Sequence, residues 1–380
     1  MKKLIYCSLL SFLFSSTSLF GQWQNKSFTF QGNTRQYRLY VPAAYNPANP
    51  VPIVFTLHGL GDNMTNFSGI GMNYIADTAN FIVICPAALT DAFLGSTAWH
   101  SGAGQFGYYP NAAINDVAFI NALIDSTSAH YSVNQDRIYS LGFSMGGFMT
   151  QRLACELSTR IAAIASMAGT IGTEISSTCN PLRPVPVAHF HGTADGTISY
   201  TANSYGMNTD ALIDFWKTKN NTDASSTHTL LPDLVADGYT VEHDVYANGD
   251  QNSVVELFKV NDADHVWLYP PANDISYAIE AWKFFSRYEL TSVVGLKESK
   301  ELQWTIYPNP TTDQITIQLP TVSKGTRLSV MNAIGQTIKA TKVSELTTKI
   351  SLDGIDPGIY FITLTDNNGQ VIQQSKIVKE

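Results

Sequence analysis

Ser144 lies between two glycines in the segment YSLGFSMGGFM. Residues 137–142 have the apolar composition of a buried strand, and residues 147–154 have the apolar spacing of a helix. A sharp strand-to-helix turn exposes a nucleophile on a strained backbone, and Gly142 and Gly146 let neighbouring segments approach closely. The first amides of the following helix point toward any anion formed at the serine. The pattern therefore predicts that Ser144 is a catalytic nucleophile.

A serine hydroxyl needs a base to take its proton and a carboxylate to orient that base. Asp195 follows the apolar run VPVAHFHG, and His265 follows the apolar run VVELFKV. This chain order of nucleophile, acid and histidine resembles the order in the α/β-hydrolase fold. Asp262 and Asp264 are alternative acids, but neighbours so close to the histidine rarely reach the ring nitrogen that faces away from the serine. We predict the triad Ser144, Asp195 and His265.

Two backbone amides are candidates for an oxyanion hole. Met145 directly follows the nucleophile, and Leu60 lies in the loop HGLGDN after the apolar run VPIVFTL. These positions supply the two N–H donors when a serine hydrolase has this chain order. His58 begins the same loop and is interpreted as shaping its turn. This chemistry needs no cofactor, and no Cys/His cluster in the sequence has metal-ligand spacing.

Five further side chains are candidates for binding a substrate through an aromatic cleft. Such a cleft would hold a phenolic acyl group or a sugar. Trp267 is the best placed, because it lies two residues past the predicted base. Ordinary core packing is the alternative for each of them. The candidates are Trp99, His100, Tyr108, Tyr109 and Trp267.

Composition and the first residues indicate an exported globular protein. The 380 residues are 44% hydrophobic and 14% charged, and the net charge of −8 disfavours nucleic-acid binding. Residues 1–22 combine two lysines, an apolar stretch and small residues, which predicts a signal peptide cleaved near Gly21 or Gln22. No other segment is long enough to span a bilayer, so we expect no stable membrane insertion. The expected location is extracellular or at the cell surface.

Export leaves three cysteines once Cys7 is removed, so at most one bridge forms within the chain. Cys85 ends the buried-type run FIVIC and is expected to pack as a small apolar group. Cys155 lies on the helix after the nucleophile, and Cys179 lies in a loop before the next strand. We predict a Cys155–Cys179 disulfide.

Apolar runs alternate with helical patterns between residues 23 and 290. This alternation predicts an α/β domain with a mainly parallel sheet that is covered on both faces. Residues 291–303 are interpreted as a linker. Residues 304–380 have short alternating strands with turn signals, which predict a small all-β sandwich domain.

The segments DVAFINALID, DRIYSLGFSMGGFMTQRLACE, PVPVAHFHGTADGTISY and DHVW together resemble a known esterase family. They are similar to secreted polyhydroxybutyrate depolymerases and the related feruloyl and acetyl-xylan esterases, over Phe28 to Tyr288. The resemblance implies an α/β-hydrolase with the triad above and ester hydrolysis without cofactor or metal. The sequence departs from the family where NDAD replaces the glycines that usually precede the histidine.

The expected substrate is a feruloyl or acetyl ester of plant cell-wall polysaccharide, either small or polymeric. An extracellular polyhydroxyalkanoate depolymerase is the alternative esterase. A serine peptidase and a non-catalytic surface binding protein are alternatives from other classes. A peptidase would usually add a propeller or a lid domain, which the sequence does not indicate.

The tail segments YPNPTTDQITI, MNAIGQTI and GIYFITL resemble the C-terminal sorting domain of type IX secretion. The resemblance implies that secretion machinery is a partner of this domain. A carbohydrate-binding or adhesive β-domain is the alternative.

Overall fold

The computed structural model describes residues 21–290, 304–319, 326–332, 337–365 and 371–380. The chain divides into two compact units between Thr291 and Ser292. The predicted linker and all but the last two residues of the predicted signal peptide lie outside the described residues. Among the described residues, no helix combines the length and apolarity that crossing a membrane requires.

The first unit contains a sheet of ten strands in the order β1-β2-β4-β3-β7-β8-β9-β12-β11-β10. The segment from β4 to β12 is parallel throughout, and antiparallel strands extend both edges. The mainly parallel sheet is therefore confirmed, although the edge strands β1 and β10 were not predicted. The strands are β1 Gln22–Phe30, β2 Asn33–Val41, β3 Val51–Leu57, β4 Ile82–Pro86, β7 Val133–Phe143, β8 Ala163–Met167, β9 Val187–Gly192, β10 Thr227–Leu230, β11 Thr240–Tyr246 and β12 Val255–Asn261.

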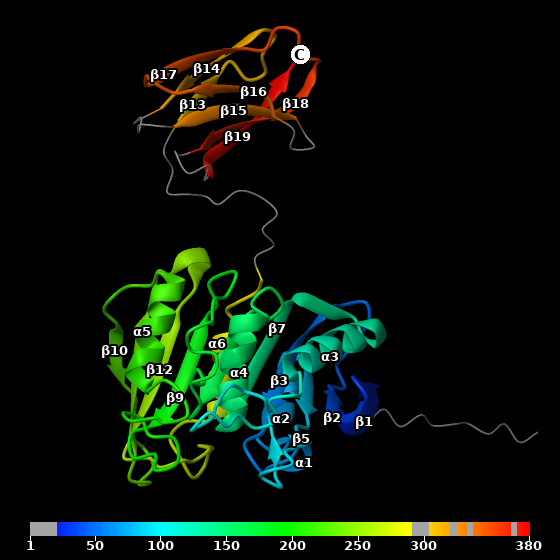
Figure 1. Ribbon diagram of the computed structural model, residues 1–380, viewed down its shortest axis with the longest axis vertical. Coiled ribbons are helices and arrows are strands. Elements are labelled where there is room, and N and C mark those ends of the chain that lie inside the picture. Colours follow the sequence, from blue (N-terminus) through cyan, green and yellow to red (C-terminus); the bar gives the residue numbers. More distant parts are fainter. Residues whose placement is uncertain (1–20, 291–303, 320–325, 333–336, 366–370) are drawn as a thin grey trace, which may run out of the picture. The chain divides into compact units, whose positions relative to one another are not determined.

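Helices cover both faces of this sheet (Figure 1). One apolar core joins the sheet to α3, α4 and α5 through Phe119, Met149 and Trp216. The other core joins it to α2 and α6 through Ala76 and Phe284. Strands β3, β4, β8 and β9 are buried along their whole length, which explains their continuous apolar sequences. The helices are α1 Met64–Phe67, α2 Met72–Ala79, α3 Asp116–His130, α4 Met145–Glu156, α5 Thr209–Asn220 and α6 Tyr277–Phe285.

The predicted site residues follow four parallel strands at their carboxyl ends. His58 follows β3, Ser144 follows β7, Asp195 lies just past β9, and His265 lies just past β12. The carboxyl ends of parallel strands meet at one edge of a sheet, where ligand sites of open α/β sheets lie. The topology therefore gathers residues that are far apart in the sequence.

Cys155 and Cys179 form a disulfide, as predicted. The bridge joins the C-terminal part of α4 to the loop before β9. Closing a loop of this length stabilises a chain by roughly 3 kcal/mol in the chain-entropy account. Cys85 is a buried free thiol on β4, and burial raises its pKa to about 12. This thiol therefore stays protonated and serves packing.

The second unit contains two small antiparallel sheets, in the orders β13-β14-β17 and β16-β15-β18-β19. Both sheets contribute to one apolar core, which includes Ile315, Leu328 and Ile362. The predicted small β-domain is confirmed. Its strands are β13 Thr305–Tyr307, β14 Gln314–Gln318, β15 Arg327–Asn332, β16 Thr337–Lys342, β17 Thr347–Ser351, β18 Gly358–Thr365 and β19 Val371–Lys379.

Candidate active site

Ser144 occupies a strained turn between β7 and α4. Its backbone has φ 55° and ψ −123°, a conformation that serine rarely adopts. The Ser144 amide donates to the Met167 carbonyl at 2.8 Å, and its carbonyl accepts from the Phe148 amide at 3.1 Å. These hydrogen bonds to β8 and α4 keep Ser144 in its strained backbone conformation. Strained conformations of this kind are typical of functional residues on a rigid scaffold.

The glycines around the serine are required by close backbone approach. A Cβ on Gly142 would lie 2.1 Å from the Gly146 carbonyl oxygen. A Cβ on Gly146 would lie 1.9 Å from the Leu57 carbonyl oxygen. Neither position can carry a side chain without moving the turn, so the motif follows from packing between β3, β7 and α4.

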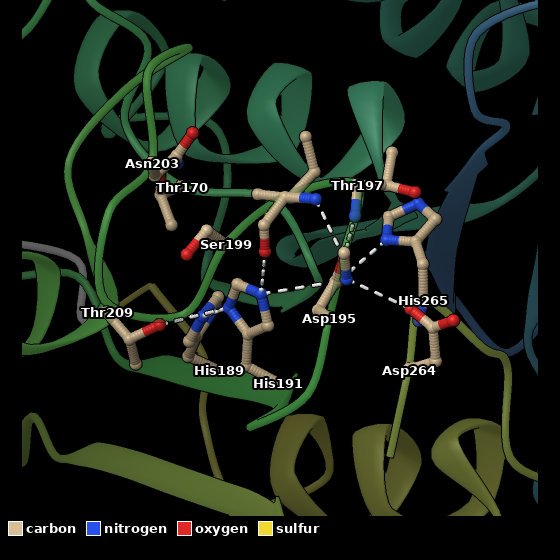
Figure 2. A network of polar contacts seen from close by, with 12 residues as sticks. Thr170, His189, His191, Asp195, Thr197, Ser199, Asn203, Thr209, Asp264 and His265 are labelled. Atoms are coloured by element: carbon tan, nitrogen blue, oxygen red, sulfur yellow. Dashed lines mark hydrogen bonds and ion pairs between the residues drawn. The ribbon is translucent and has the colours of Figure 1, made fainter. Parts of the chain in front are cut away.

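His265 and Asp195 are in direct contact, as Figure 2 shows. His265 Nδ1 lies 2.7 Å from Asp195 Oδ2. Asp195 Oδ1 accepts from the amides of Thr197 at 2.8 Å and Ile198 at 2.7 Å. Burial raises the pKa of Asp195, but hydrogen bonds from His191 and His265 outweigh burial and hold that pKa well below its usual range. The carboxylate is therefore ionised at neutral pH, and it holds the proton of His265 on Nδ1 and leaves Nε2 free to act as a base.

Neither of the two alternative acids contacts the base through its carboxylate. Asp264 Oδ1 accepts from the Gly196 amide at 3.0 Å and from the His265 amide at 2.7 Å. Asp262 is exposed and has a positive φ of 62°. Among the contacts of the described residues, neither carboxylate reaches the imidazole ring of His265, and Asp195 does.

Ser144 and His265 line the same cavity, which has a volume of about 360 Å³. The Phe143 ring lies against His265 with ring centroids 4.7 Å apart, and Tyr205 lies on another wall. A Cβ on Gly59 would lie 3.3 Å from the Ser144 Cβ, so the loop after β3 passes directly beside the serine. The nucleophile and base candidates therefore line one shared cavity.

The oxyanion-hole candidates lie in the wall of this cavity. Leu60 and Met145 both line it, and Met145 is the first residue of α4. Amides in the first turn of a helix have no acceptor within the helix. In the described part of the chain, neither of these two amides makes a hydrogen bond. Both donors are thus available to an anion in the cavity.

His58 holds the loop that carries Leu60. Its Nδ1 donates to the Gly59 carbonyl at 2.8 Å, and its Nε2 accepts from the Ala88 amide at 3.1 Å. Burial lowers the pKa of His58, so the ring is neutral. This role agrees with the interpretation of His58 as a turn-shaping residue.

The predicted aromatic cleft requires correction for Trp99 and His100. Trp99 is fully buried, and its indole N–H donates to the His58 carbonyl at 2.9 Å. His100 Nε2 lies 2.9 Å from Glu174 Oε2, and its Nδ1 lies 3.0 Å from the Ile114 carbonyl. Both side chains are committed to protein partners, and neither lines the cavity that holds Ser144.

Tyr108 and Tyr109 are also placed away from the cavity that holds Ser144. The Tyr108 hydroxyl donates to Asp91 Oδ1 at 2.5 Å. The Tyr109 ring packs so closely on Gly104 that a Cβ there would lie 2.4 Å from it. These two side chains stabilise the loop that contains them. The sequence could not reveal this role, because their partners lie 17 and five residues away in an irregular segment.

Trp267 lines a second cavity, which has a volume of about 640 Å³. Asp62 and Phe143 line both cavities, so the two spaces adjoin. The Trp267 ring packs edge-on against Phe67 with centroids 5.5 Å apart. Its indole N–H is buried and has no hydrogen-bond partner among the described residues. The second cavity thus has a largely apolar wall to which Trp267, Phe67 and Phe143 contribute. Sequence reasoning missed Phe143 as a lining residue, although its place directly before the nucleophile is a signal for one.

Among the described residues, one group of side chains elsewhere could hold a metal ion. His228, Glu242 and Asp244 bring ligand atoms within 4.8 Å of one another on β10 and β11. Glu242 already accepts from Lys259 at 3.2 Å, and Asp244 contacts His228 at 3.0 Å. The group is satisfied by protein partners and lies outside the lining of both cavities.

Two segments of the chain match known families. Residues 41–239 match the family described as Phospholipase/Carboxylesterase. Residues 305–380 match the Secretion system C-terminal sorting domain. The second match bears out the predicted sorting domain of a secreted protein.

Individual relatives cover different shares of the chain. A bifunctional acetylxylan esterase/xylanase of Neocallimastix patriciarum is 28% identical over 172 residues, which are 45% of this chain and 23% of that protein. Feruloyl esterase D of Neurospora crassa is 24% identical over 279 residues, which are 70% of this chain and 86% of that protein. The chain therefore spans less than a quarter of the first relative and most of the second.

Solved structures show the same fold at low sequence identity. An acetyl xylan esterase from Aspergillus awamori has a TM-score of 0.51 at 14% identity, covering 70% of this chain and 99% of that chain. This likeness supports the α/β-hydrolase architecture of the first unit.

Proposed function

Because the chain belongs to the Phospholipase/Carboxylesterase family, we propose that it is a secreted serine esterase with Ser144, Asp195 and His265 as its catalytic triad. The observation that carries the proposal is the 2.7 Å contact between His265 Nδ1 and Asp195 Oδ2, with the histidine in the same cavity as the strained serine. A nucleophile, a base and an orienting carboxylate are the three parts that acyl transfer requires.

Acylation starts when Ser144 Oγ attacks the ester carbonyl carbon while His265 Nε2 takes the hydroxyl proton. The carbonyl oxygen becomes an oxyanion, and the Leu60 and Met145 amides donate to it. The tetrahedral intermediate collapses to an acyl-serine, and His265 returns the proton to the departing alcohol. Water then attacks the acyl-serine with His265 as base, which releases the carboxylic acid and restores the serine.

Asp195 stabilises the imidazolium that forms in each half of the reaction. The buried carboxylate stays ionised, because its lowered pKa keeps protons off it at neutral pH. The proton stays on His265, and Asp195 acts through charge and orientation.

We propose feruloyl or acetyl esters of plant cell-wall polysaccharide as the substrates. The relatives named feruloyl esterase D and acetylxylan esterase/xylanase support this class. The adjoining cavity lined by Trp267 and Phe143 supports an aromatic acyl group such as feruloyl, which packs well on aromatic walls. A polyhydroxyalkanoate depolymerase is the alternative esterase, and a serine peptidase or a non-catalytic binding protein is the alternative of another class.

Labelling and hydrolysis test the activity and its nucleophile together. A fluorophosphonate should label the wild-type protein and should not label Ser144→Ala, and the variant should lose nearly all hydrolysis of a short nitrophenyl ester. A folded Ser144→Ala protein that keeps wild-type turnover would overturn the proposal. Absence of labelling and of hydrolysis in the wild type would favour a binding protein.

A substrate panel tests the ester class. The panel represents each proposed and alternative activity by one or two substrates: methyl ferulate, acetylated xylan, polyhydroxybutyrate and a peptide amide. Methyl ferulate and acetylated xylan should have the highest kcat/KM.

Trp267→Ala tests the second cavity as the acyl site. It should raise KM for methyl ferulate by about tenfold, since loss of one large aromatic contact costs about 1–2 kcal/mol. KM for a nitrophenyl acetate should change less than about twofold. Equal effects on both esters would place the aromatic acyl group elsewhere.

A further inference from the structure

A line of buried polar side chains leads from Asp195 into the core through two histidines of β9 (Figure 2). His191 Nε2 lies 3.4 Å from Asp195 Oδ2 and 2.8 Å from the Ile198 carbonyl. His191 Nδ1 lies 3.1 Å from His189 Nε2. His189 is 0% exposed and His191 is 1% exposed, so both rings make these contacts away from bulk solvent.

The line continues across three further elements. His189 Nδ1 lies 2.8 Å from Ser166 Oγ on β8. The Gln151 amide group on α4 donates to the same oxygen at 2.7 Å. The Trp216 indole N–H on α5 donates to Gln151 Oε1 at 2.8 Å. All three side chains are fully buried. The line therefore ties α5 and the helix that follows Ser144 to the catalytic acid.

The chemistry of the groups fixes the direction of the bonds at the Trp216 end of this line. An indole N–H can only donate, so Gln151 must present its oxygen to Trp216 and its NH₂ to Ser166. Ser166 accepts that bond and keeps its own hydroxyl proton, which it can donate to His189 Nδ1. His189 then carries its proton on Nε2 and donates to His191 Nδ1.

The other end of the line agrees with this direction. The Ile198 carbonyl and the Asp195 carboxylate can only accept, so His191 must carry a proton on Nε2. The Thr209 hydroxyl lies 3.0 Å from His191 Nδ1 and provides that nitrogen with a second donor (Figure 2). Burial and the neighbouring His191 lower the pKa of His189 and outweigh a hydrogen bond with the Ser166 backbone that raises it, so the ring is neutral.

From this agreement we propose that His191 is a positioning residue of the catalytic acid, and that Trp216, Gln151, Ser166 and His189 hold its proton on Nε2. The inference rests on the proposed function only for the role of Asp195. The Nε2 proton of His191 goes to the Ile198 carbonyl, and the same nitrogen lies 3.4 Å from Oδ2, where it adds a weaker electrostatic contact beside His265. His191 also fixes the carbonyl of Ile198, whose amide donates to Oδ1. Both oxygens of Asp195 are thereby held with the carboxylate aimed at the base.

A matched pair of variants at His191 tests the positioning role. His191→Leu removes the donor, and His191→Gln keeps an amide N–H at nearly the position of Nε2. His191→Leu should lower kcat for a short nitrophenyl ester about tenfold to hundredfold, which is part of the ~10²–10⁴-fold contribution of general acid–base catalysis, with KM within about threefold. His191→Gln should recover kcat to within about fivefold of wild type. The rate of fluorophosphonate labelling should follow kcat, because it reports activation of Ser144 without ester turnover.

Ser166→Ala interrupts the line at its middle and should give an intermediate loss of kcat. Near-UV circular dichroism and thermal unfolding identify variants that fail to fold, and only folded variants are compared. A folded His191→Leu protein with wild-type kcat and labelling rate would overturn the proposal. So would a His191→Gln protein as impaired as the leucine variant.

Nuclear magnetic resonance tests the proton positions without reference to activity. Long-range ¹H–¹⁵N correlation spectra of protein with ¹⁵N-labelled histidine distinguish the two neutral tautomers. His189 and His191 should both carry their proton on Nε2 at pH 7, with assignments from His189→Gln and His191→Gln. A proton on Nδ1 of either ring would refute the proposed direction. If the tautomers are as expected but the wild type hydrolyses no ester, the proposed function fails and the hydrogen-bonded line stands.

Discussion

Asp195 and Asp264 differ by their partners, although both lie near His265. Asp195 contacts the imidazole ring, and Asp264 contacts two backbone amides. Asp195→Asn should therefore reduce kcat/KM for a nitrophenyl ester by about 10³–10⁴-fold, because the amide group favours the wrong histidine tautomer.

Asp264→Asn is the matched control, since it makes the same change one residue before the base. It should reduce kcat/KM less than about tenfold. If the Asp264 variant is the more impaired of the two, the acid is Asp264 and the role assigned to Asp195 is wrong.

Outside the active site, Asp91 is a carboxylate whose lowered pKa makes the stability of the fold depend on pH. Its carboxylate accepts from the Tyr108 hydroxyl and from the amides of Phe93, Leu94 and Asn111. Burial raises the pKa of Asp91, but these hydrogen bonds outweigh burial and lower the pKa to about 2. The folded-state pKa lies below the value of about 3.9 for an unfolded aspartate. The ionised group therefore stabilises the fold fully above pH 4, and this contribution is lost as the pH falls toward 2.

Asp91→Asn should consequently lower the free energy of unfolding at pH 7, and the gap from wild type should close between pH 4 and pH 2. Urea unfolding at pH 7, 5, 4 and 3 measures the gap. Asp214→Asn serves as a control on the exposed side of α5 and should show no such pH-dependent gap. A gap for Asp91→Asn that is equal at pH 3 and pH 7 would contradict the assignment.

At the scale of elements, the turn between β7 and α4 depends on the contact of α4 with β3. A Cβ on Gly146 would lie 1.9 Å from the Leu57 carbonyl oxygen, so Gly146→Ala must push α4 away from the strand. The expected loss of stability is about 3 kcal/mol or more, which is the upper end for overpacking. Urea unfolding gives this value, and fluorophosphonate labelling should be lost with it because the serine is displaced.

Gly196→Ala is the matched control near the same site. Its Cβ would lie 3.7 Å from Asp264 Oδ1, which is an ordinary contact. Its stability should stay within about 0.5 kcal/mol of wild type. A Gly146→Ala protein as stable and as reactive as Gly196→Ala would show that close packing does not form the turn.

At the scale of the whole molecule, the catalytic candidates and the sorting domain belong to different units. Every residue of the proposed triad lies before Thr291, and the second unit has its own apolar core. Leu290 still belongs to the first unit, since its amide donates to the Asp136 carbonyl at 2.6 Å. A chain of residues 21–290 should therefore fold, with kcat/KM within about threefold of the longer chain.

Removal of residues 291–380 in the native host should in contrast stop export, because the sorting domain is lost. Immunoblots of culture medium and periplasm measure the distribution, and the full chain is the control. Unfolding of the 21–290 protein would mean that the β-domain supports the enzyme. Normal export without the tail would contradict the sorting role. Weaker binding to insoluble polysaccharide would favour a carbohydrate-binding tail.

Much of this architecture was predictable because its signals are local. The turn at Ser144 depends on residues within a few positions of it, and continuous apolar runs mark strands that are buried on both faces. The Cys155–Cys179 bridge was predictable because three cysteines remain after export and Cys85 belongs to a buried-type apolar run. The edge strand β10 was missed because all four of its residues are exposed, so it has no alternating apolar pattern.

The sequence by itself determined the kinds of residue available for chemistry, their chain order and the strands they follow. Only the tertiary structure decided which of them meet. β9 pairs in parallel with β12, with Val187 opposite Val255, and this register brings Asp195 to His265 across 70 positions. The tertiary structure also buries Trp99, places Trp267 at a cavity and brings together the buried hydrogen-bonded side chains that contact His191. Short-range periodicity carries no information on such contacts, because they depend on the order and register of strands distant in the chain.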